Sequence, residues 1–357
     1  MKIFKDIIIS LLLLLGFNKY YGQQISGKVL DSESVLPLQE VIISSTNNKD
    51  TIITDDQGTF ILPHIGTYIF SKKGYQKKTL TLNGTFTIIQ LEADANALPE
   101  VVLQASQLPV TESKSTFSSE VIPVVEIAKN NSLAMAPVLN SVPGVYMQSG
   151  ALNTARVIIR GIGSRNLYGT AKIRAYFKDI PLTTGNGESA VEDIEIGNLA
   201  SVEIIKGPVS SIYGAGLGGS IHFFPRNAWL NYKDVATGFI AGSYGMLKGI
   251  TDLNYGSEKN SFRLHYSNTK SDGYRDNSNY KRQNFTFVSN HFLNSEDVLS
   301  VIAAYVDLNA QIPSSIDKDT YLNNPEAAAV NWKNARGYEK TNKFLAGRRT
   351  VMEPFLF

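Results

Sequence analysis

From residue 235 onward, apolar and polar side chains alternate along runs of about ten residues. The alternation is clearest in six consecutive residues: Phe262, Arg263, Leu264, His265, Tyr266 and Ser267. It is typical of strands in a transmembrane β-barrel, where lipid-facing and lumen-facing residues take turns. We count five such runs, at residues 235–244, 247–255, 261–271, 280–292 and 297–308. The chain is therefore predicted to be mainly β.

The connections between these runs predict the orientation of the sheet. Residues 256–260 and 293–296 are short connections, whereas residues 272–279 and 309–341 are longer. The tight Gly245-Met246 connection is an exception. Because the periplasmic turns of such barrels are the short ones, we expect the chain to enter the sheet from the periplasm.

Five strands are too few to close a barrel. A spanning barrel must close because lipid offers no partner for an unpaired strand edge, and the smallest single-chain examples use about eight strands. The alternation is also lost after residue 348, where Pro354 would interrupt a ladder of hydrogen bonds. We therefore expect residues 229–357 to be a partial, truncated outer-membrane β-barrel.

The amino terminus has the pattern of a secretory signal peptide. Lys2 and Lys5 precede an apolar run at residues 7–15, which is too short to span a bilayer as a helix. We predict a signal peptide over residues 1–22, cleaved after Gly22, and hence export. The chain has no cysteine, which excludes disulfides and thiolate metal sites, and its net charge of +2 gives no indication of nucleic-acid binding.

Residues 23–95 show short runs of period two separated by turn clusters, such as those at residues 31–34 and 55–58. Short strands at this spacing predict a small, Ig-like β-sandwich. Its single histidine, His64, offers no set of zinc ligands, so no metal site is expected there.

Two apolar runs, residues 202–205 and 221–224, flank a stretch rich in glycine. The spacing Gly214-x-Gly216-x-x-Gly219 satisfies the dinucleotide-binding pattern, but a strand and not a helix is predicted after it. We therefore expect no cofactor. The stretch is predicted to be a structural turn, to which we assign Gly161, Gly207, Pro208, Gly214, Gly216 and Gly219.

Four fragments follow one another in a specific order and spacing: Arg156-Val-Ile-Ile-Arg160-Gly161, Ile173-Arg-Ala-Tyr-Phe-Lys-Asp179-Ile-Pro181-Leu182, Ile204-Ile-Lys206-Gly207-Pro208 and Ile212-Tyr213-Gly214. Together they resemble the plug domain of TonB-dependent outer-membrane receptors. The resemblance implies an α+β plug domain over residues 117–228, seated inside a polar barrel lumen. An acidic helical turn is expected within it at residues 191–199. The sandwich resembles the carboxypeptidase-regulatory-like domain that precedes many such receptors in Bacteroidetes.

Residues 96–116 are interpreted as a TonB box and linker. A short apolar segment followed by a polar tract suits strand addition to the sheet edge of another protein. By the resemblance, the TonB box is Leu98, Pro99, Glu100, Val101, Val102 and Leu103. The alternative is that residues 101–103 are the last strand of the preceding sandwich.

The resemblance also implies a lock between plug and barrel. Arg160 and Lys206 occupy positions whose basic side chains pair, in the resembled receptors, with barrel carboxylates. Those carboxylates would lie on strands beyond Phe357. The alternative is that both are ordinary solvated charges beside glycine turns.

The resemblance implies the amino-terminal part of a TonB-dependent receptor in the cell outer membrane, with TonB, the lipid bilayer and a ferric siderophore or ferric citrate as partners. The competing hypothesis is a non-transporting, secreted or periplasmic binding module left by truncation of such a receptor. An enzyme is not expected, because the four histidines show no metal-ligand spacing and no catalytic set is present. The sequence does not identify the ligand.

Overall fold

The structure is a computed structural model that describes residues 24–46, 51–84, 86–94, 102–103, 110–111, 117–131, 133–152, 154–166, 169–208, 213–214, 216–294 and 297–351. The predicted signal peptide and the first four residues of the predicted TonB box, Leu98 to Val101, lie outside these ranges. No helix in the described part of the chain is long and apolar enough to cross a membrane.

The first unit is a β-sandwich of two small sheets, with strand orders β4-β1-β7 and β3-β2-β5-β6. Alternate residues of the strands point inward and form one buried core that includes Val29, Ile43, Phe60, Phe70 and Leu91. The strands are β1 (Ile25–Asp31), β2 (Ile42–Ser45), β3 (Thr51–Ile53), β4 (Thr59–Leu62), β5 (Gly66–Ser71), β6 (Lys78–Leu82) and β7 (Phe86–Leu91).

The second unit is an α+β domain built on a mixed sheet with strand order β10-β15-β16-β13-β14. Every residue of β16 is buried, which explains the continuous apolar run predicted there as a strand. The elements are β10 (Ser119–Pro123), α2 (Val124–Ala128), α3 (Ala136–Asn140), β11 (Val145–Ala151), β12 (Thr154–Ile159), β13 (Ile173–Phe177), β14 (Ile180–Pro181), η2 (Val191–Asp193), η3 (Ile196–Asn198), β15 (Leu199–Lys206) and β16 (Gly219–Pro225).

The third unit is an antiparallel sheet of six strands in sequence order. It is open, with β17 and β22 at its edges, so it is an incomplete barrel as expected. Two short helices, α5 (Lys318–Asn323) and α6 (Val330–Ala335), connect its last two strands. The strands are β17 (Lys233–Gly242), β18 (Met246–Gly256), β19 (Asn260–Ser271), β20 (Tyr280–Phe292), β21 (Val298–Gln311) and β22 (Tyr338–Val351).

The predicted count of five strands was wrong, because β22 follows the connection with α5 and α6 and pairs with β21 over its whole length. Its half-buried face carries Thr341, Lys343 and Leu345, and its exposed face carries Lys340 and Phe344. Polar residues stand on both faces, so the strand lacks the alternation of hydrophobicity by which the other five were found.

The face of β21 that carries Ile302 and Ala304 points toward the second unit. Ile302 and Ala304 are buried in the same core as Phe177, Leu182 and Ile194 of that unit. The outward face of β21 includes Tyr305, which is exposed. Alternation therefore identified the strand correctly, but its most apolar face covers the neighbouring domain.

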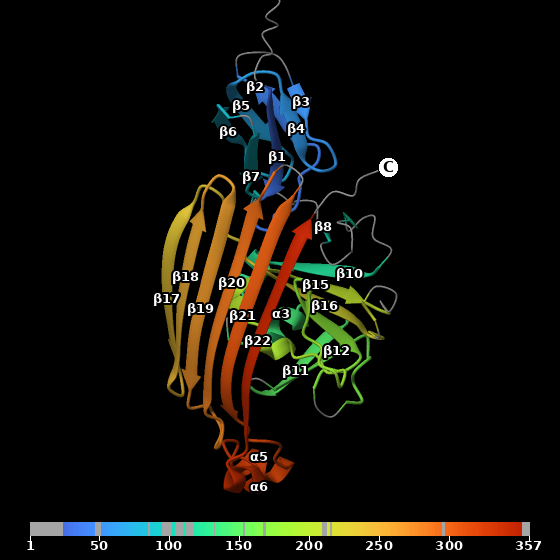
Figure 1. Cartoon of the computed structure of the whole chain (residues 1–357). Helices are drawn as coiled ribbons and strands as arrows, with labels where there is room; N and C mark the ends of the chain where they lie inside the picture. Colours follow the sequence, from blue (N-terminus) through green and yellow to red (C-terminus); the bar gives the residue numbers. More distant parts are fainter. Residues whose placement is uncertain are drawn as a thin grey trace, which may run out of the picture.

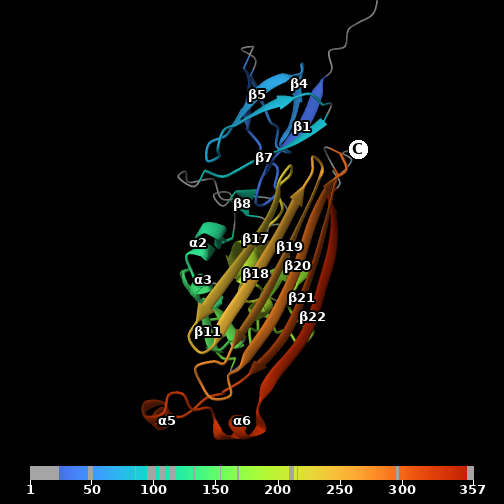
Figure 2. The same cartoon turned by 90° about the vertical axis from the view of Figure 1, so that its left-hand side faces the viewer.

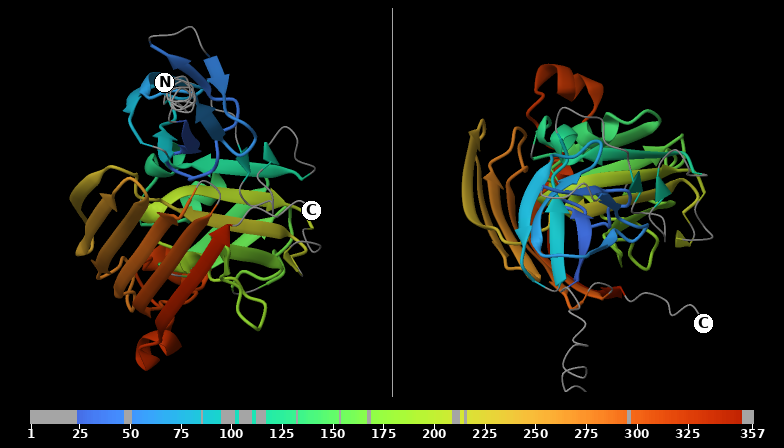
Figure 3. Two further views of the ribbon diagram at one scale, coloured as in Figure 1. Left: turned by 45° about the horizontal axis from the view of Figure 1, so that its top comes forward. Right: turned by 90° about the horizontal axis from the view of Figure 1, so that it is seen from above.

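The three units pack together in a definite order. The α+β domain lies against the concave side of the six-stranded sheet, as Figures 2 and 3 show. The sandwich sits at the end of the sheet that carries the short turns, and α5 and α6 lie at the opposite end (Figure 1). The second unit is thus placed where the lumen of a barrel would be.

Candidate functional site: the plug-like domain and its contacts with the sheet

The predicted glycine turn connects the antiparallel strands β15 and β16, whose ladder ends with Lys206 opposite Gly219. Gly207 and Gly219 have φ values of +130° and +126°, which side-chain-bearing residues rarely adopt. A Cβ atom on Gly219 would lie 2.0 Å from the carbonyl oxygen of Ile205, whereas Gly207 has open space at that position. The turn therefore requires glycine at position 219 both for its φ value and for the close approach of two backbones.

The other predicted turn residues lie around this loop. Gly207 donates its backbone N–H to the carbonyl of Gly218 at 3.2 Å, and Gly216 donates to Gly214 at 2.6 Å. Pro208 follows Gly207 directly, and Gly161 stands in a separate turn just after β12.

Arg160 and Lys206, the two residues of the predicted lock, are brought together. One guanidinium nitrogen of Arg160 donates to the backbone carbonyl of Lys206 at 3.1 Å, and the other donates to Ser118 Oγ at 2.7 Å. Lys206 Nζ lies 3.3 Å from Glu120 Oε2. Within the described residues, neither side chain forms an ion pair with a carboxylate of the six-stranded sheet.

Val102 and Leu103 of the predicted TonB box form β8 (Val102–Leu103), which pairs antiparallel with β9 (Val110–Thr111). This two-stranded ribbon belongs to neither sheet of the sandwich. The alternative that these residues are the last strand of the sandwich is therefore wrong for Val102 and Leu103. In the described part of the chain β8 pairs with one strand, β9.

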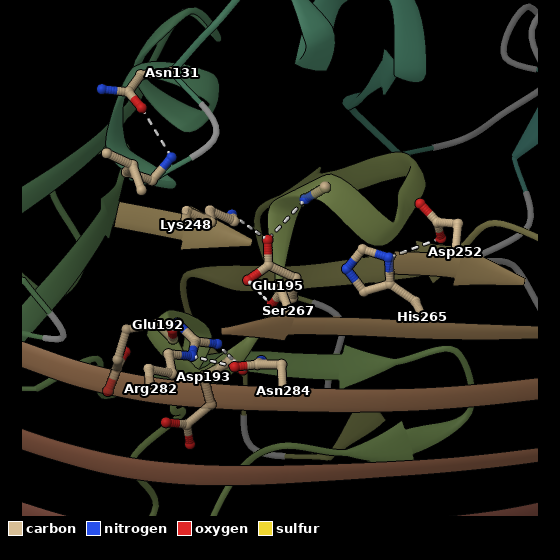
Figure 4. A network of polar contacts seen from close by, with 12 residues as sticks. Asn131, Glu192, Asp193, Glu195, Lys248, Asp252, His265, Ser267, Arg282 and Asn284 are labelled. Atoms are coloured by element: carbon tan, nitrogen blue, oxygen red, sulfur yellow. Dashed lines mark hydrogen bonds and ion pairs between the residues drawn. The ribbon is translucent and has the colours of Figure 1, made fainter. Parts of the chain in front are cut away.

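A buried ion pair between the α+β domain and the sheet was not predicted. Glu195, at the start of η3, accepts a hydrogen bond from Lys248 Nζ of β18 at 2.6 Å, and both side chains are buried (Figure 4). Its other oxygen accepts from Ser267 Oγ of β19 at 3.1 Å. Burial raises the pKa of Glu195, but Lys248 and Arg282 outweigh it and lower the pKa, which keeps the carboxylate charged.

A second group of contacts surrounds η2 on the same side of the domain. Arg282 of β20 donates to the backbone carbonyls of Glu192, at 2.9 Å, and of Asp193. Lys343 of β22 forms an ion pair with the Asp193 carboxylate. The acidic turn of the domain is therefore held by three basic side chains of the sheet, and these come from three different strands.

The sequence predicted the acidic side of these contacts but not their basic partners. An acidic helical turn was expected at residues 191–199, and the structure forms it as η2 and η3. Lys248, Arg282 and Lys343 could not be assigned as its partners, because pairing across about 50 to 150 residues of chain depends on the docking of two domains.

A cavity of about 390 Å³ lies between the acidic turn and the sheet. Asp193, Asn198, Asn284 and Thr286 supply polar groups to its lining. Among the described residues, no cluster of three or more His, Asp or Glu side chains is arranged to hold a metal ion.

The opposite face of the mixed sheet carries a buried histidine in an aromatic cluster. The ring of His222 on β16 stacks on Tyr176 with centroids 4.9 Å apart and contacts Tyr213 at 4.6 Å. Its Nε2 lies 2.9 Å from Ser220 Oγ. Burial lowers the pKa of His222 to about 3.

This pKa predicts a loss of stability in acid. Below the ordinary pKa of 6.5 the unfolded chain binds a proton at His222 and the folded chain does not until about pH 3, so stability falls over that interval. Between pH 7 and pH 5 the loss from this group should be about 2 kcal/mol. Urea unfolding of the parent chain and of His222→Phe, which keeps the ring stacking, should show a smaller acid loss in the variant. An equal loss in both would contradict the prediction.

The sequence of this domain matches a known family. Residues 111–221 match the family model described as the TonB-dependent Receptor Plug Domain. This stretch of the chain is therefore similar to the plug domain of TonB-dependent receptors. The resemblance drawn from the four sequence fragments is confirmed by this match.

Solved structures show the same fold around the plug. The ferric citrate transporter FecA in its unliganded form is similar with a TM-score of 0.52 and 18% identity, over 65% of this chain and 37% of that protein. A structure of the FpvAI–pyocin S2 complex is similar with a TM-score of 0.51 and 17% identity, over 69% of this chain and 33% of that one. This chain therefore spans about a third of the length of each of these two proteins.

Proposed function

We propose that this chain supplies the amino-terminal part of a TonB-dependent importer in the outer membrane, in which the plug blocks the lumen until TonB pulls on the box. The observation that carries this proposal is the plug domain seated on the lumenal face of the sheet through the buried Glu195–Lys248 pair. The ion pairs and hydrogen bonds of this contact hold the plug against the sheet at rest. Water can replace them when force is applied to the plug.

The proposed division of the chain follows the sequence: residues 1–22 as signal peptide, 23–95 as a carboxypeptidase-regulatory-like sandwich, 96–116 as TonB box and linker, 117–228 as plug and 229–357 as partial barrel. Each sheet of the structure takes all its strands from one of these segments, which supports the division.

We assign Arg160 and Lys206 to a lock between the plug and further barrel strands. Support comes from their position, because the two side chains lie together beside the glycine turn and Lys206 already takes a carboxylate partner in Glu120. A barrel carboxylate reaching this point would meet two cations at once.

The proposed cargo is an iron complex, a ferric siderophore or ferric citrate. Support comes from the plug segment Arg160-Gly161-Ile-Gly163-Ser-Arg165, which resembles receptors of this kind, and from the fold shared with a ferric citrate transporter. Growth under iron limitation on a panel of siderophores, with the gene deleted and restored, identifies the ligand. Rescue by an iron-free nutrient alone would overturn the assignment.

The box assignment predicts a specific defect. Val101→Pro removes a donor of the strand that would pair with the sheet edge of TonB, so energised uptake should fall to background while ligand binding is unchanged. The measurement is uptake of radioactive ferric ligand beside equilibrium binding to de-energised cells, in a receptor with a closed barrel. Ser106→Pro, in the polar linker, is the control and should transport normally.

Two results would contradict this function. Equal loss of binding and uptake in Val101→Pro would show that the segment is structural. Recovery of the chain as a soluble periplasmic protein on cell fractionation would favour the competing binding module.

A further inference from the structure

The amino-terminal sandwich is docked on the end of the barrel sheet through apolar contacts. Leu30 of β1 and Ile88 of β7 share one buried cluster with Phe292 at the end of β20. Leu230 and Val298 pack against the same cluster. At its margin the ammonium group of Lys259 lies 5.6 Å from the centre of the Phe86 ring. The sandwich is therefore seated on the short turns of the sheet.

Polar contacts fix the sandwich to the segment that joins the plug to the barrel. This segment, residues 226–232, runs from the end of β16 to β17. Asn227 Nδ2 donates to the carbonyl of Glu33 at 2.8 Å, and the backbone N–H of Leu230 donates to Gln90 Oε1 at 2.6 Å. We call this segment the plug exit.

Glu33 reaches the plug exit from a preorganised turn. Asp31 Oδ1 accepts the backbone N–H groups of Glu33, at 3.0 Å, and of Ser34, at 2.7 Å. The turn places Glu33 Oε2 3.9 Å from Arg226 Nε. Burial raises the pKa of Glu33 above its ordinary value, and the nearby guanidinium of Arg226 offsets part of this rise.

The plug exit is tied in turn to the seat of the plug. The backbone N–H of Arg226 donates to the carbonyl of Asn198 at 2.8 Å, and Asn198 ends the turn η3. The side chain of Glu195 caps that turn by accepting from the N–H of Gly197 at 3.3 Å. The carboxylate of Glu195 therefore binds Lys248 of the six-stranded sheet and also caps η3, the turn to which the plug exit is hydrogen-bonded.

From this continuous path we propose that the sandwich is a latch on the plug exit. The sandwich stays docked on the sheet while the Glu195–Lys248 ion pair is intact. Loss of this pair weakens the docking of the sandwich. The coupling is reciprocal, because two contacts that favour the same arrangement must stabilise each other equally. Undocking of the sandwich, on the periplasmic side, would then accompany movement of the plug out of its contact with the sheet.

The inference rests on the proposed function only for the statement that the plug leaves its seat. Docking and coupling can be tested without ligand, TonB or uptake, so failure of this test is distinguishable from failure of the transport proposal.

The absence of native cysteine makes cross-linking a direct test. In a receptor with a closed barrel that carries this chain, Phe86→Cys with Lys259→Cys should be bridged by a short bismaleimide. Ile53→Cys with Lys259→Cys should not, because Ile53 is exposed on β3, on the side of the sandwich away from the sheet (Figure 1). Gln283→Cys with Asp307→Cys, opposite each other on β20 and β21, reports that the sheet has formed.

The coupling is tested by adding a substitution at the seat. Lys248→Met should lower the yield of the 86–259 cross-link several-fold, and Ser267→Ala, which removes one hydrogen bond to Glu195, should lower it less. Asp276→Asn, which breaks an exposed ion pair with Lys333 in the connections at the far end of the sheet, should leave it unchanged.

Each outcome decides the proposal. An 86–259 yield that neither seat variant changes while the 283–307 bridge persists would overturn the coupling. If Lys248→Met also abolishes the 283–307 bridge, the sheet has not formed in that variant, and the 86–259 yield of Ser267→Ala then decides whether the coupling exists. Failure of both bridges in the parent chain would overturn the proposal together with the packing on which it rests.

Discussion

Replacing Lys248 with methionine should destabilise the seated plug by about 3 kcal/mol or more, because it leaves the carboxylate of Glu195 buried without its closest cation. Methionine fills a similar volume, so the loss comes from the charge and not from a cavity. The measurement is pulse proteolysis across a urea series, in a receptor with a closed barrel that carries this chain, which follows the fraction of unfolded plug.

The double variant Glu195→Gln with Lys248→Met tests the cause. With both charges removed, more than half of the lost stability should return, because the penalty belongs to the unpaired carboxylate. Asp276→Asn is the matched control, since its ion pair with Lys333 is exposed and should contribute at most about 1 kcal/mol. A double variant as unstable as Lys248→Met alone would show that the pair does not hold the plug.

Gly219→Ala should prevent the plug sheet from forming, at a cost of more than about 4 kcal/mol. The new methyl group would lie 2.0 Å from the carbonyl oxygen of Ile205, and neither backbone can move without breaking the β15–β16 ladder. Protease resistance of the plug and the urea midpoint of the chain are the measurements, and both should fall sharply.

Gly207→Ala provides a control in which the clash is absent. Its φ of +130° is almost the same as the +126° of Gly219, but no atom lies within 4 Å of the added Cβ. This variant should lose only the cost of backbone strain, about 1–3 kcal/mol. Equal losses in the two variants would mean that φ alone, and not the close approach at Gly219, explains the requirement.

Much of the architecture could be predicted from local sequence patterns. Alternation located five of the six barrel strands, and β20 was predicted with the observed boundaries, because period-two burial is encoded residue by residue. The order of glycines and apolar runs likewise located β15, β16 and the turn between them. These features depend on the pattern along one segment and its flanking residues.

Other features depended on how segments far apart in the sequence meet. The sixth strand, β22, was missed because its half-buried face includes Lys343, whose partner Asp193 lies 150 residues earlier. The apolar face of β21 covers the plug core, because Ile302 and Ala304 are buried in one cluster with side chains of the plug.

The sequence by itself determined the strands, the glycine turn and the resemblance to a plug domain, since each is written in the spacing of neighbouring residues. Only the tertiary structure decided that Glu195 pairs with Lys248 and that Glu33 of the sandwich faces Arg226 of the plug exit. A charged side chain has many possible partners in a sequence with 34 basic and 32 acidic residues. The docking of whole domains selects one of them, because burial makes an unpaired charge too costly to keep.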